Sequence, residues 1–594
     1  MKRKRETIHR GIPVAPGYGT GTTLVYRPYV PALAETVLTP EAVRDELARF
    51  RRAVRSAERE LRGLHEQVTR DMGRDFADFI GVQLAMVRDP DVVEKAEAFI
   101  KEKRRNAEFA YAETLKGLAT PMSGSTPLFK ERMLDITDVS NRVLRHLLGD
   151  EARSVLEMER GTVLVAHDLP PSDAALLDPD RIAGLVLEIG GKTSHTAIMA
   201  KAKGIPAVAG AEGVTGSVED GEDVFVDGFR GLAIVSPTRN RLRGYDVEIR
   251  RRRRHLQSLS RLTDEAPVTL NKKTIDLSAN IEFLAEARAA HANGARGVGL
   301  FRTEYMYLAK RRPPTEEEQY QVYTEVAELF DPHPVIVRTF DLGGDKVLAG
   351  YTEPNPFLGF RAIRLSLENT EMFQSQLRAI LRASAHGNIK VMFPMIATVE
   401  ELRRAKLEVE KAKRSLLGEK AEFDEDFEVG VMVEIPSAAI IADRLARECS
   451  FLSIGSNDLT QYTLAVDRGN ERVAKLFNPF HPAVLSLIKQ TIDAAHRHGI
   501  WSGLCGEFGS DPLGIFVLLG MGIDEISVSA GSIPEAKNII RSIDTDAAAE
   551  IVGLALKGST ALEVERVLLR EIHRRLPGLG ELLAVARGGN GGSS

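Results

Sequence analysis

Residues 299–304 read Gly299-Leu300-Phe301-Arg302-Thr303-Glu304, a short apolar run that ends abruptly in polar side chains. The same form recurs between about residues 266 and 578, with helix-like segments such as 396–415 and 483–498 in between. The predicted strands end at Asn280, Arg302, Arg338, Met395, Glu434, Asn457, Cys505 and Ser527. Eight strand–helix units in succession predict a (β/α)8 barrel, in which catalytic groups lie at the carboxyl ends of the strands. The polar residues of this chain fall at those ends.

Charged side chains of two kinds gather at these strand ends. Arg302, Arg338 and Arg468 follow apolar strands or the loops after them, and planar guanidinium groups bind phosphate and carboxylate through two parallel hydrogen bonds. Glu434 and Asp458 offer hard oxygen ligands, which suit Mg2+ together with substrate oxygens and water. Ion pairs at the barrel rim are the alternative interpretation. Five such residues at the same end of different strands argue against it and predict a site for a small anion and a divalent cation.

The segment from about residue 36 to residue 149 has a helical pattern. There is no proline between Pro40 and Pro90. Apolar residues recur there at steps of three and four, at Leu47, Phe50, Val54, Ala57, Leu61, Leu64 and Val68. This stripe predicts a long amphipathic helix that packs as a hairpin against its neighbours. The segment carries no chemical motif of its own.

An α/β unit is predicted for about residues 155–235, where short β-branched runs alternate with Gly, Pro and Asp. The N-terminal strand is expected to join it. A polar stretch at about residues 238–262 follows, with consecutive arginines from Arg250 to Arg254. These arginines have no aromatic residues between them and the net charge of the chain is -5. A solvated connecting helix is therefore favoured over a patch that binds nucleic acid.

The overall composition is that of an ordinary soluble protein with several domains. The 594 residues are 43% hydrophobic and 27% charged. Cys449 and Cys505 cannot form a disulfide framework, and they fit a reducing compartment. No apolar run approaches about 18 residues, so no membrane span is expected. No apolar core follows the basic start, Met1 to Arg5, so no secretory signal is expected. These features predict a cytoplasmic protein.

His195 stands at the start of a predicted helix, after a strand and the turn Gly190-Gly191. Thr193 or Ser194 can cap this helix, and the free backbone N–H groups at a helix start stabilise phosphate. A neutral imidazole is nucleophilic at about pH 7 and forms a labile N–P bond. The residues alone leave two interpretations open, a phosphoryl acceptor and a helix-start histidine that bonds to a neighbour.

The stretch from Gly190 to Ala200, GGKTSHTAIMA, closely resembles the phosphohistidine signature of Enzyme I of the bacterial sugar phosphotransferase system. The wider superfamily includes pyruvate phosphate dikinase and phosphoenolpyruvate synthase. The resemblance runs from about residue 8 to about residue 578 and includes the barrel motifs. It implies that the phosphoryl group of phosphoenolpyruvate passes to His195 with release of pyruvate. The group then passes to a histidine of the phosphocarrier protein HPr, as the first step of sugar uptake.

The resemblance also implies a multidomain α/β architecture: a swivelling phosphohistidine α/β domain with an all-α helical insert, followed by a (β/α)8 TIM barrel. The expected parts are residues 1–35 and 150–237 for the phosphohistidine domain, 36–149 for the HPr-binding insert, 238–262 for a helical linker, 263–578 for the phosphoenolpyruvate-binding and dimerisation barrel, and 579–594 for a disordered tail. A homodimer is expected from the family. Neither nucleic-acid binding nor membrane insertion is expected from the composition.

The family implies a role for each candidate residue of the barrel. Arg302, Arg338, Asn457 and Arg468 would bind phosphoenolpyruvate, Arg361 would be a further phosphate contact, and Glu434 and Asp458 would hold Mg2+. Cys505 stands where the family has its acid, in a Cys-Gly-Glu motif. The enolate left by phosphoryl transfer must gain a proton at carbon, and a thiol with an ordinary pKa of about 8.5 suits that task. A buried structural cysteine is the alternative, and it is favoured for Cys449.

Two residues depart from the family pattern. Pro170 stands in place of a threonine whose hydroxyl often bonds the active histidine, so Ser172 or Thr193 becomes a candidate to hold the ring. Lys192 replaces a common arginine and keeps the charge without the planar guanidinium group.

The rival functions are a dikinase or phosphoenolpyruvate synthase, a barrel lyase, and a non-catalytic phosphorelay scaffold. The first would need an ATP-grasp domain, which the sequence does not show.

Overall fold

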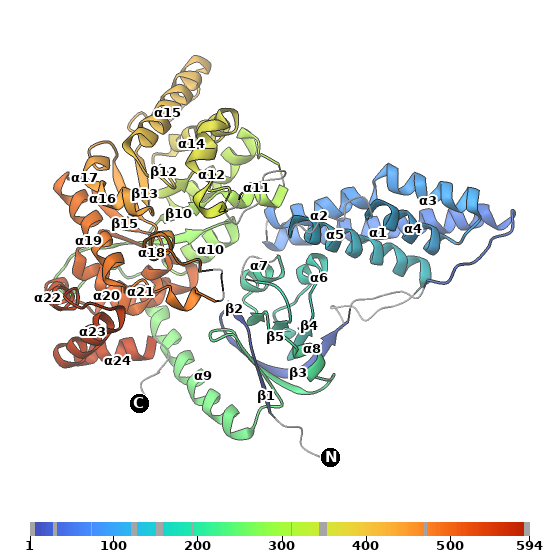
Figure 1. Cartoon of the computed structure of the whole chain (residues 1–594), viewed down its shortest axis with the longest axis horizontal. Helices are drawn as coiled ribbons and strands as arrows, with labels where there is room; N and C mark the ends of the chain where they lie inside the picture. The colour runs from blue at the N-terminus through green and yellow to red at the C-terminus, as the bar shows by residue number, and fades with distance from the viewer. Residues whose placement is uncertain are drawn as a thin grey trace. The chain divides into compact units, whose positions relative to one another are not determined.

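The structure is a computed structural model. It describes residues 6–27, 33–72, 74–119, 127–149, 158–191, 195–310, 312–343, 353, 355–468, 470 and 472–586, apart from some side chains within helices. The chain divides into two compact units, Met1–Arg252 and Arg253–Ser594 (Figure 1). Each unit has its own sheet, and each is described by itself.

An eight-stranded mixed sheet forms the α/β part of the first unit. Its strands are β1 (Thr7–Arg10), β2 (Ile12–Ala15), β3 (Tyr18–Tyr26), β4 (Thr162–Ala166), β5 (Ile182–Leu187), β6 (Ala207–Ala209), β7 (Asp223–Asp227) and β8 (Leu232–Val235), in the order β1-β8-β7-β3-β4-β5-β6-β2. β3, β4, β5 and β6 run parallel. Valines such as Val163, Val186 and Val208 fill the core beside the sheet, as expected for β-branched residues. Because β4 and β5 are parallel, the loops that follow them emerge at the same edge of the sheet.

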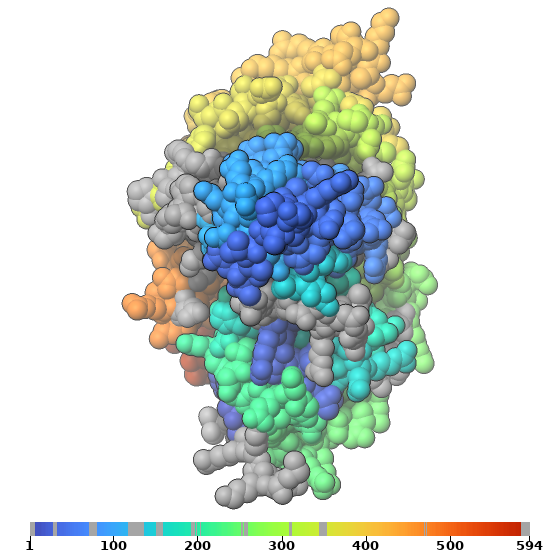
Figure 2. Space-filling model, turned by 90° about the vertical axis from the view of Figure 1, so that its right-hand side faces the viewer, coloured from blue at the N-terminus to red at the C-terminus, as the bar shows by residue number. Residues whose placement is uncertain are grey.

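Five helices between β3 and β4 form the insert. They are α1 (Ala42–Met72), α2 (Arg74–Val87), α3 (Pro90–Lys103), α4 (Ala107–Ala119) and α5 (Pro127–Leu148). The proline-free segment is thus two helices: α1 carries the apolar stripe, with Phe50, Ala57 and Leu61 buried, and α2 packs against it. Figure 2 shows the first helices of the insert, in blue, as one continuous surface facing the viewer.

The second unit contains a closed barrel of eight parallel strands, which confirms the fold predicted from the sequence. The strands are β9 (Asp276–Ile281), β10 (Val298–Arg302), β11 (Val335–Arg338), β12 (Ile389–Phe393), β13 (Val429–Val433), β14 (Phe451–Ile454), β15 (Trp501–Leu504) and β16 (Glu525–Ser529). Arg302 and Arg338 are the last residues of their strands, and Glu434 and Cys505 directly follow theirs. Asn457 differs from the prediction, because it lies within the next helix, α18 (Ser456–Leu464).

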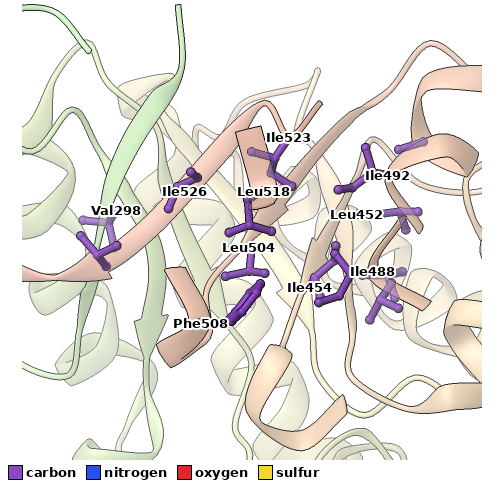
Figure 3. Close-up of a cluster of buried hydrophobic side chains, with 14 of the residues drawn as sticks. Val298, Leu452, Ile454, Ile488, Ile492, Leu504, Phe508, Leu518, Ile523 and Ile526 are labelled. Carbon is purple, nitrogen blue, oxygen red and sulfur yellow. The ribbon is translucent and has the colours of Figure 1, made fainter. Parts of the chain in front are cut away.

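Helices cover the outer face of the barrel. The longest are α12 (Glu316–Phe330), α14 (Thr370–Ala383), α15 (Val399–Glu419), α19 (Pro482–Arg497) and α23 (Ala561–Arg575). In Figure 3, Leu452 and Ile454 of β14 lie beside Ile488 and Ile492 of α19, and all four side chains are buried. Full burial of such a side chain stabilises the fold by about 1.5–3 kcal/mol. This packing holds the strands, and so the residues at their carboxyl ends, in fixed positions.

The C-terminal segment corrects the expected boundary of the tail. Disorder was expected from residue 579, but α24 (Pro577–Ala586) is helical. Leu579 and Leu583, four residues apart and thus on one face of the helix, are buried in the core of the barrel unit. Residues 587–594 lie outside the described residues.

The boundary between the two units falls within α9 (Arg239–Leu259), the helix at the predicted linker. Within the described ranges, no helix combines the length and apolar character that a membrane crossing requires.

Candidate active site

His195 is the first residue of α7 (His195–Ala202), in the first unit. The next residue, Thr196, is buried and donates a hydrogen bond from its hydroxyl to the carbonyl oxygen of Leu169 at 2.8 Å. This bond ties the start of α7 to the loop after β4. The predicted cap, Thr193 or Ser194, and the departure at Lys192 lie outside the described residues.

Ser172 belongs to a buried polar network that joins α6 (Pro171–Ala175) to the helical insert. Its hydroxyl donates to Oδ2 of Asp138 at 2.6 Å and accepts from Nη2 of Arg142 at 2.8 Å. Gln83 donates to the same oxygen of Asp138 at 2.9 Å. Because a serine hydroxyl has one proton, which Asp138 receives, Ser172 does not donate to the imidazole. The side chain of His195 lies outside the described part of the chain, so a role of Ser172 in holding the ring stays a prediction.

Two arginines of the barrel share one carboxylate. Asp341, just after β11, accepts two parallel hydrogen bonds from Arg361, at 2.8 Å from Nε and 2.9 Å from Nη2. Its Oδ2 also lies 3.5 Å from Nη1 of Arg338. Arg338 in turn donates from Nη2 to Glu304 at 2.5 Å. All four side chains are buried, so the low local dielectric strengthens these bonds and fixes both guanidinium groups.

Glu434, directly after β13, and Asp458, in α18, approach this network from other parts of the barrel. Asp458 accepts from Nη2 of Arg361 at 3.0 Å, and Glu434 accepts from the backbone N–H of Met395 at 2.7 Å. Met395 has φ +57°, an uncommon value for a residue with a side chain, and this conformation directs its N–H toward the carboxylate. Burial, and then the charges of Asp458 and Asp341, raise the pKa of the Glu434 carboxyl to about 8. Carboxylates that oppose one another's ionisation form a site that gains from a cation.

Glu434 and Asp458 are the residues that would hold a divalent cation at this end of the barrel. Gly455, directly after β14, leaves the space that the Glu434 carboxylate occupies, since a Cβ there would lie 2.9 Å from Oε2 of Glu434. Among the residues that the structure describes, no cluster of three or more His, Cys, Asp or Glu side chains is placed to hold a metal. Mg2+ commonly takes one or two carboxylates and completes its shell with phosphate oxygens and water. The donor set therefore suits Mg2+ bound together with a phosphorylated substrate.

Arg302, Asn457 and Arg468 belong to the same end of the barrel and are less enclosed. Arg302 donates to Glu282 at 2.7 Å, and its side chain is 34% exposed. Asn457 accepts from the backbone N–H of Glu507 at 3.0 Å. Arg468 is 46% exposed, and its Nη1 lies 3.9 Å from the carboxylate of the same Glu507. Partly exposed cations with few fixed bonds remain available to an anionic ligand.

Cys505 is buried just after β15, and only 2% of its surface is exposed. The hydroxyl of Ser453 donates to its Sγ at 3.5 Å, and Sγ lies 3.7 Å from the carbonyl oxygen of Ile454. Burial raises the pKa of the thiol to about 12. The ordinary thiol pKa of about 8.5, expected from the sequence, is therefore too low for this buried cysteine. The thiol is therefore protonated at neutral pH, which is the state that a proton donor needs.

The groups that hold the arginines could not be identified from the sequence. Glu304 bonds Arg338, Asp341 bonds Arg361, and Tyr462 accepts a hydrogen bond from Arg361 at 3.2 Å; the sequence did not predict any of these three contacts. The available signal was an acidic residue two or three positions after an arginine at a strand end. That pattern does not show which arginine the carboxylate holds.

A cavity of about 340 Å³ lies elsewhere in the barrel unit, lined by residues that include Lys273, Met521 and Leu556. Lys273 precedes β9 and Met521 precedes β16, so the cavity is near the amino ends of these strands. The candidate residues lie at the carboxyl ends. The cavity is therefore not part of the candidate site.

Comparison with known proteins gives matches along most of the chain. Family models described as "PEP-utilising enzyme, N-terminal", "PEP-utilising enzyme, mobile domain" and "PEP-utilising enzyme, PEP-binding domain" match residues 10–132, 158–231 and 257–545. A phosphoenolpyruvate-protein phosphotransferase from Geobacillus stearothermophilus is 43% identical over 94% of this chain and 97% of its own length. A phosphoenolpyruvate-protein phosphotransferase from Haemophilus influenzae is 39% identical over 94% of this chain and 98% of its own length. A solution structure titled Enzyme I (nEIt) is 32% identical and covers 40% of this chain and 97% of its own, with a TM-score of 0.36.

Proposed function

This chain belongs to the family of phosphoenolpyruvate-protein phosphotransferases, and we propose that it transfers the phosphoryl group of phosphoenolpyruvate to its own His195 and then to a histidine of the phosphocarrier protein HPr. Pyruvate is the second product. The identity to family members along nearly the whole chain supports the reaction. The three matching models of phosphoenolpyruvate-utilising enzymes support the substrate.

The observation that carries the assignment of the donor site is the shared carboxylate of Asp341, which orients both Arg338 and Arg361. Two guanidinium groups fixed at the carboxyl ends of barrel strands suit a ligand with both a phosphate and a carboxylate. Nε of Arg338 is buried and meets no hydrogen-bond acceptor in the described part of the chain. Such an orphan donor is rare without a functional reason, and an anionic ligand supplies one.

The residues of the barrel mouth then take separate roles. Arg302, Arg338, Arg361, Asn457 and Arg468 bind phosphoenolpyruvate. Glu434 and Asp458 would hold Mg2+, which supplies positive charge to the phosphoryl oxygens. Fixed positive groups at the places where charge develops are the main source of catalysis in phosphoryl transfer. Cys505, protonated at neutral pH, donates a proton to carbon of the enolate and so completes pyruvate.

His195 is the acceptor, and the helical insert binds the carrier. As the first residue of α7, His195 stands beside the free N–H groups and the positive end of the helix dipole, both of which favour phosphate. The phosphohistidine domain swivels between the donor site and HPr, which docks on α1 to α5. We propose further that the protein acts in the cytoplasm, as a Mg2+-dependent homodimer, in the first step of sugar uptake.

Phosphoenolpyruvate labelled in its phosphoryl group, with Mg2+ and candidate carriers, tests the proposal directly. The wild-type chain is expected to take up the label and pass it to HPr, and His195→Ala is expected to label neither protein. Labelled ATP separates this function from that of a dikinase or synthase, because only those enzymes take up its phosphoryl group. Retained labelling of His195→Ala excludes His195 as the acceptor. Failure of the wild type to accept label from phosphoenolpyruvate excludes the reaction itself.

A further inference from the structure

Five consecutive arginines, from Arg250 to Arg254, lie where one compact unit of the chain gives way to the other. Helix α9 continues through this arginine run, and the boundary between the two units falls inside it. In the sequence no acidic residue occurs between Glu248 and Asp264. The segment that joins the two units therefore carries a concentrated positive charge.

The part of α9 before the arginine run is fixed to the sheet of the first unit. Tyr245 is buried, and its ring centroid lies 4.1 Å from that of Phe225 in β7. Ile249, directly before the run, packs against the same apolar cluster. Glu248 accepts a hydrogen bond from Arg230 at 2.8 Å. These contacts tie α9 to the first unit as far as the start of the run.

The chain after α9 is fixed to the barrel unit by two cations of α21 (Ile533–Arg541). Lys537 is 1% exposed, and its Nζ donates to the carbonyl oxygen of Thr263 at 2.6 Å. Arg541 donates from Nη1 to the carbonyl oxygen of Ala266 at 2.7 Å. The two cations are four residues apart and so lie on one face of α21. Together they hold the segment that enters the barrel, and the arginine run lies between this attachment and the one in the first unit.

The arginine run weakens α9 between its two attachments. Like charges three or four positions apart on a helix repel each other and destabilise it. Arg250 and Arg254 are four positions apart and both are exposed, and Arg251 lies three positions before Arg254. Arg250 donates from Nε to the backbone oxygen of Asp246 at 3.2 Å. This bond leaves the charge of the guanidinium group without a compensating charge.

We propose that the arginine run is the hinge on which the phosphohistidine domain swivels, and that repulsion among its charges keeps this hinge flexible. The inference rests on the proposed function, which requires the swivel. In this mechanism α9 opens locally at the run. Its first part moves with the first unit, and the segment held by α21 stays with the barrel. Screening or removal of the repulsion then stiffens the hinge.

Gly244 is the other residue of α9 that weakens the helix, because glycine is a poor helix former. It lies between Leu242 and Tyr245, which both pack against the apolar cluster of the first unit. Bending at Gly244 would therefore break contacts within one unit. The arginine run has no such cost, since the attachments on its two sides belong to different units.

Arg254→Glu tests the hinge, because it makes two repulsive pairs, with Arg250 and with Arg251, attractive. Hydrogen–deuterium exchange of the backbone amides of residues 250–258 is expected to slow by about fivefold or more. NaCl screens these charges. Added salt should therefore slow the exchange in the wild type, where it weakens repulsion, and accelerate it in Arg254→Glu, where it weakens attraction. Gly244→Ala, whose added Cβ meets nothing within 4 Å, stiffens α9 where it is already attached and should keep the wild-type exchange of residues 250–258.

A stiffer hinge should also slow the step that needs the swivel. In a single turnover, transfer of the phosphoryl group from phosphoenolpyruvate to His195 is expected to slow by about fivefold or more in Arg254→Glu. The rate in Gly244→Ala should equal that of the wild type. The Kd for phosphoenolpyruvate should be the same in all three proteins, because neither substitution touches the donor site.

The outcomes separate the hinge from the function on which it rests. Unchanged amide exchange in Arg254→Glu, or a salt response with the sign of the wild type, overturns charge control of the hinge. Slower exchange with a wild-type rate of transfer overturns its role in the swivel. Arg254→Gln removes repulsion without adding attraction, so it should give intermediate effects, and it decides the question if Arg254→Glu does not fold. Failure of the wild type to take label from phosphoenolpyruvate would instead overturn the proposed function.

Discussion

Asp341 holds Arg361 through two parallel hydrogen bonds of 2.8 and 2.9 Å, and the same carboxylate lies 3.5 Å from Arg338. One buried anion therefore sets the orientation of two cations that are distant in the sequence. The backbone next to Arg361 is unusual as well, because Ala362 has φ +55° and donates its N–H to Leu342 at 2.8 Å. A non-glycine residue in this conformation costs about 1–3 kcal/mol, which is typical of positions that a functional site requires.

Replacement of Asp341 by alanine should weaken both the site and the fold. Arg361 loses its bidentate partner and two buried arginines lose a counter-charge, so we expect a decrease of about 3–5 kcal/mol in the free energy of unfolding. The KM for phosphoenolpyruvate should rise by about tenfold or more. Urea denaturation and a pyruvate-release assay measure the two effects. Glu448→Ala removes an exposed ion pair with Arg403 and should leave the KM unchanged. An unchanged KM in Asp341→Ala would contradict the shared-carboxylate model.

Gly455→Ala should raise the concentration of Mg2+ that the protein needs for activity. The added Cβ would lie 2.8 Å from Cβ and 2.9 Å from Oε2 of Glu434, so the carboxylate must move. Displacement of a ligand typically costs about 10–100-fold in metal affinity, and the Mg2+ concentration for half-maximal activity should rise accordingly. Gly418→Ala in α15 meets nothing within 4 Å and serves as the matched control. Equal Mg2+ requirements in the two variants would argue against Glu434 as a ligand.

Ser172→Ala should destabilise the first unit, because Arg142 and Asp138 each lose a buried partner. An unsatisfied buried polar group costs about 1–3 kcal/mol, which should appear as an earlier denaturation midpoint of the N-terminal unit. Ser56→Ala on α1, where the hydroxyl accepts a bond from Arg59 at the surface, should have little effect. A stability of Ser172→Ala equal to that of Ser56→Ala would mean that the network contributes nothing.

Stability should also fall in alkali because of Cys505. Burial raises the pKa of the folded thiol to about 12, whereas the unfolded thiol ionises at about 8.5. Below the lower value the thiol is protonated in both states, and above it the unfolded state alone loses a proton. The free energy of unfolding should therefore drop with rising pH, by about 1.4 kcal/mol per pH unit for this thiol. Chemical denaturation between about pH 9 and 10.5 should show a smaller slope for Cys505→Ser than for the wild type.

The barrel could be predicted from the sequence because its strands are short apolar runs, most of them with a polar residue at or just after the carboxyl end. Arg302 and Arg338 end their strands as expected. The tail helix was missed because Leu579 and Leu583 supply only two buried positions before the Gly/Ser-rich end. The strands were found and the C-terminal helix was missed for the same reason: both predictions depend on the local pattern of apolar residues.

Relationships across the barrel could not be predicted in the same way. The bond between Arg361 and Asp341 spans twenty residues, and that between Arg361 and Asp458 spans 97. Glu525 stands in an ordinary strand sequence, and only the glycines opposite it, Gly299 and Gly503, show that its carboxyl group has a prepared space. The acidity of Cys505 depends on burial, which the motif does not contain.

Cys505→Ala should nearly abolish pyruvate formation while His195 remains intact. Cys505 is the proposed proton donor to the enolate carbon, and loss of a general acid typically costs about 10²–10⁴-fold. A coupled pyruvate assay measures the forward rate, and exchange of the pyruvate methyl protons with D2O measures the same proton transfer without turnover. Cys449→Ala is the matched control, since burial also raises the pKa of that thiol to about 12 but it lies outside the site. Normal turnover and exchange in Cys505→Ala would remove Cys505 from the reaction.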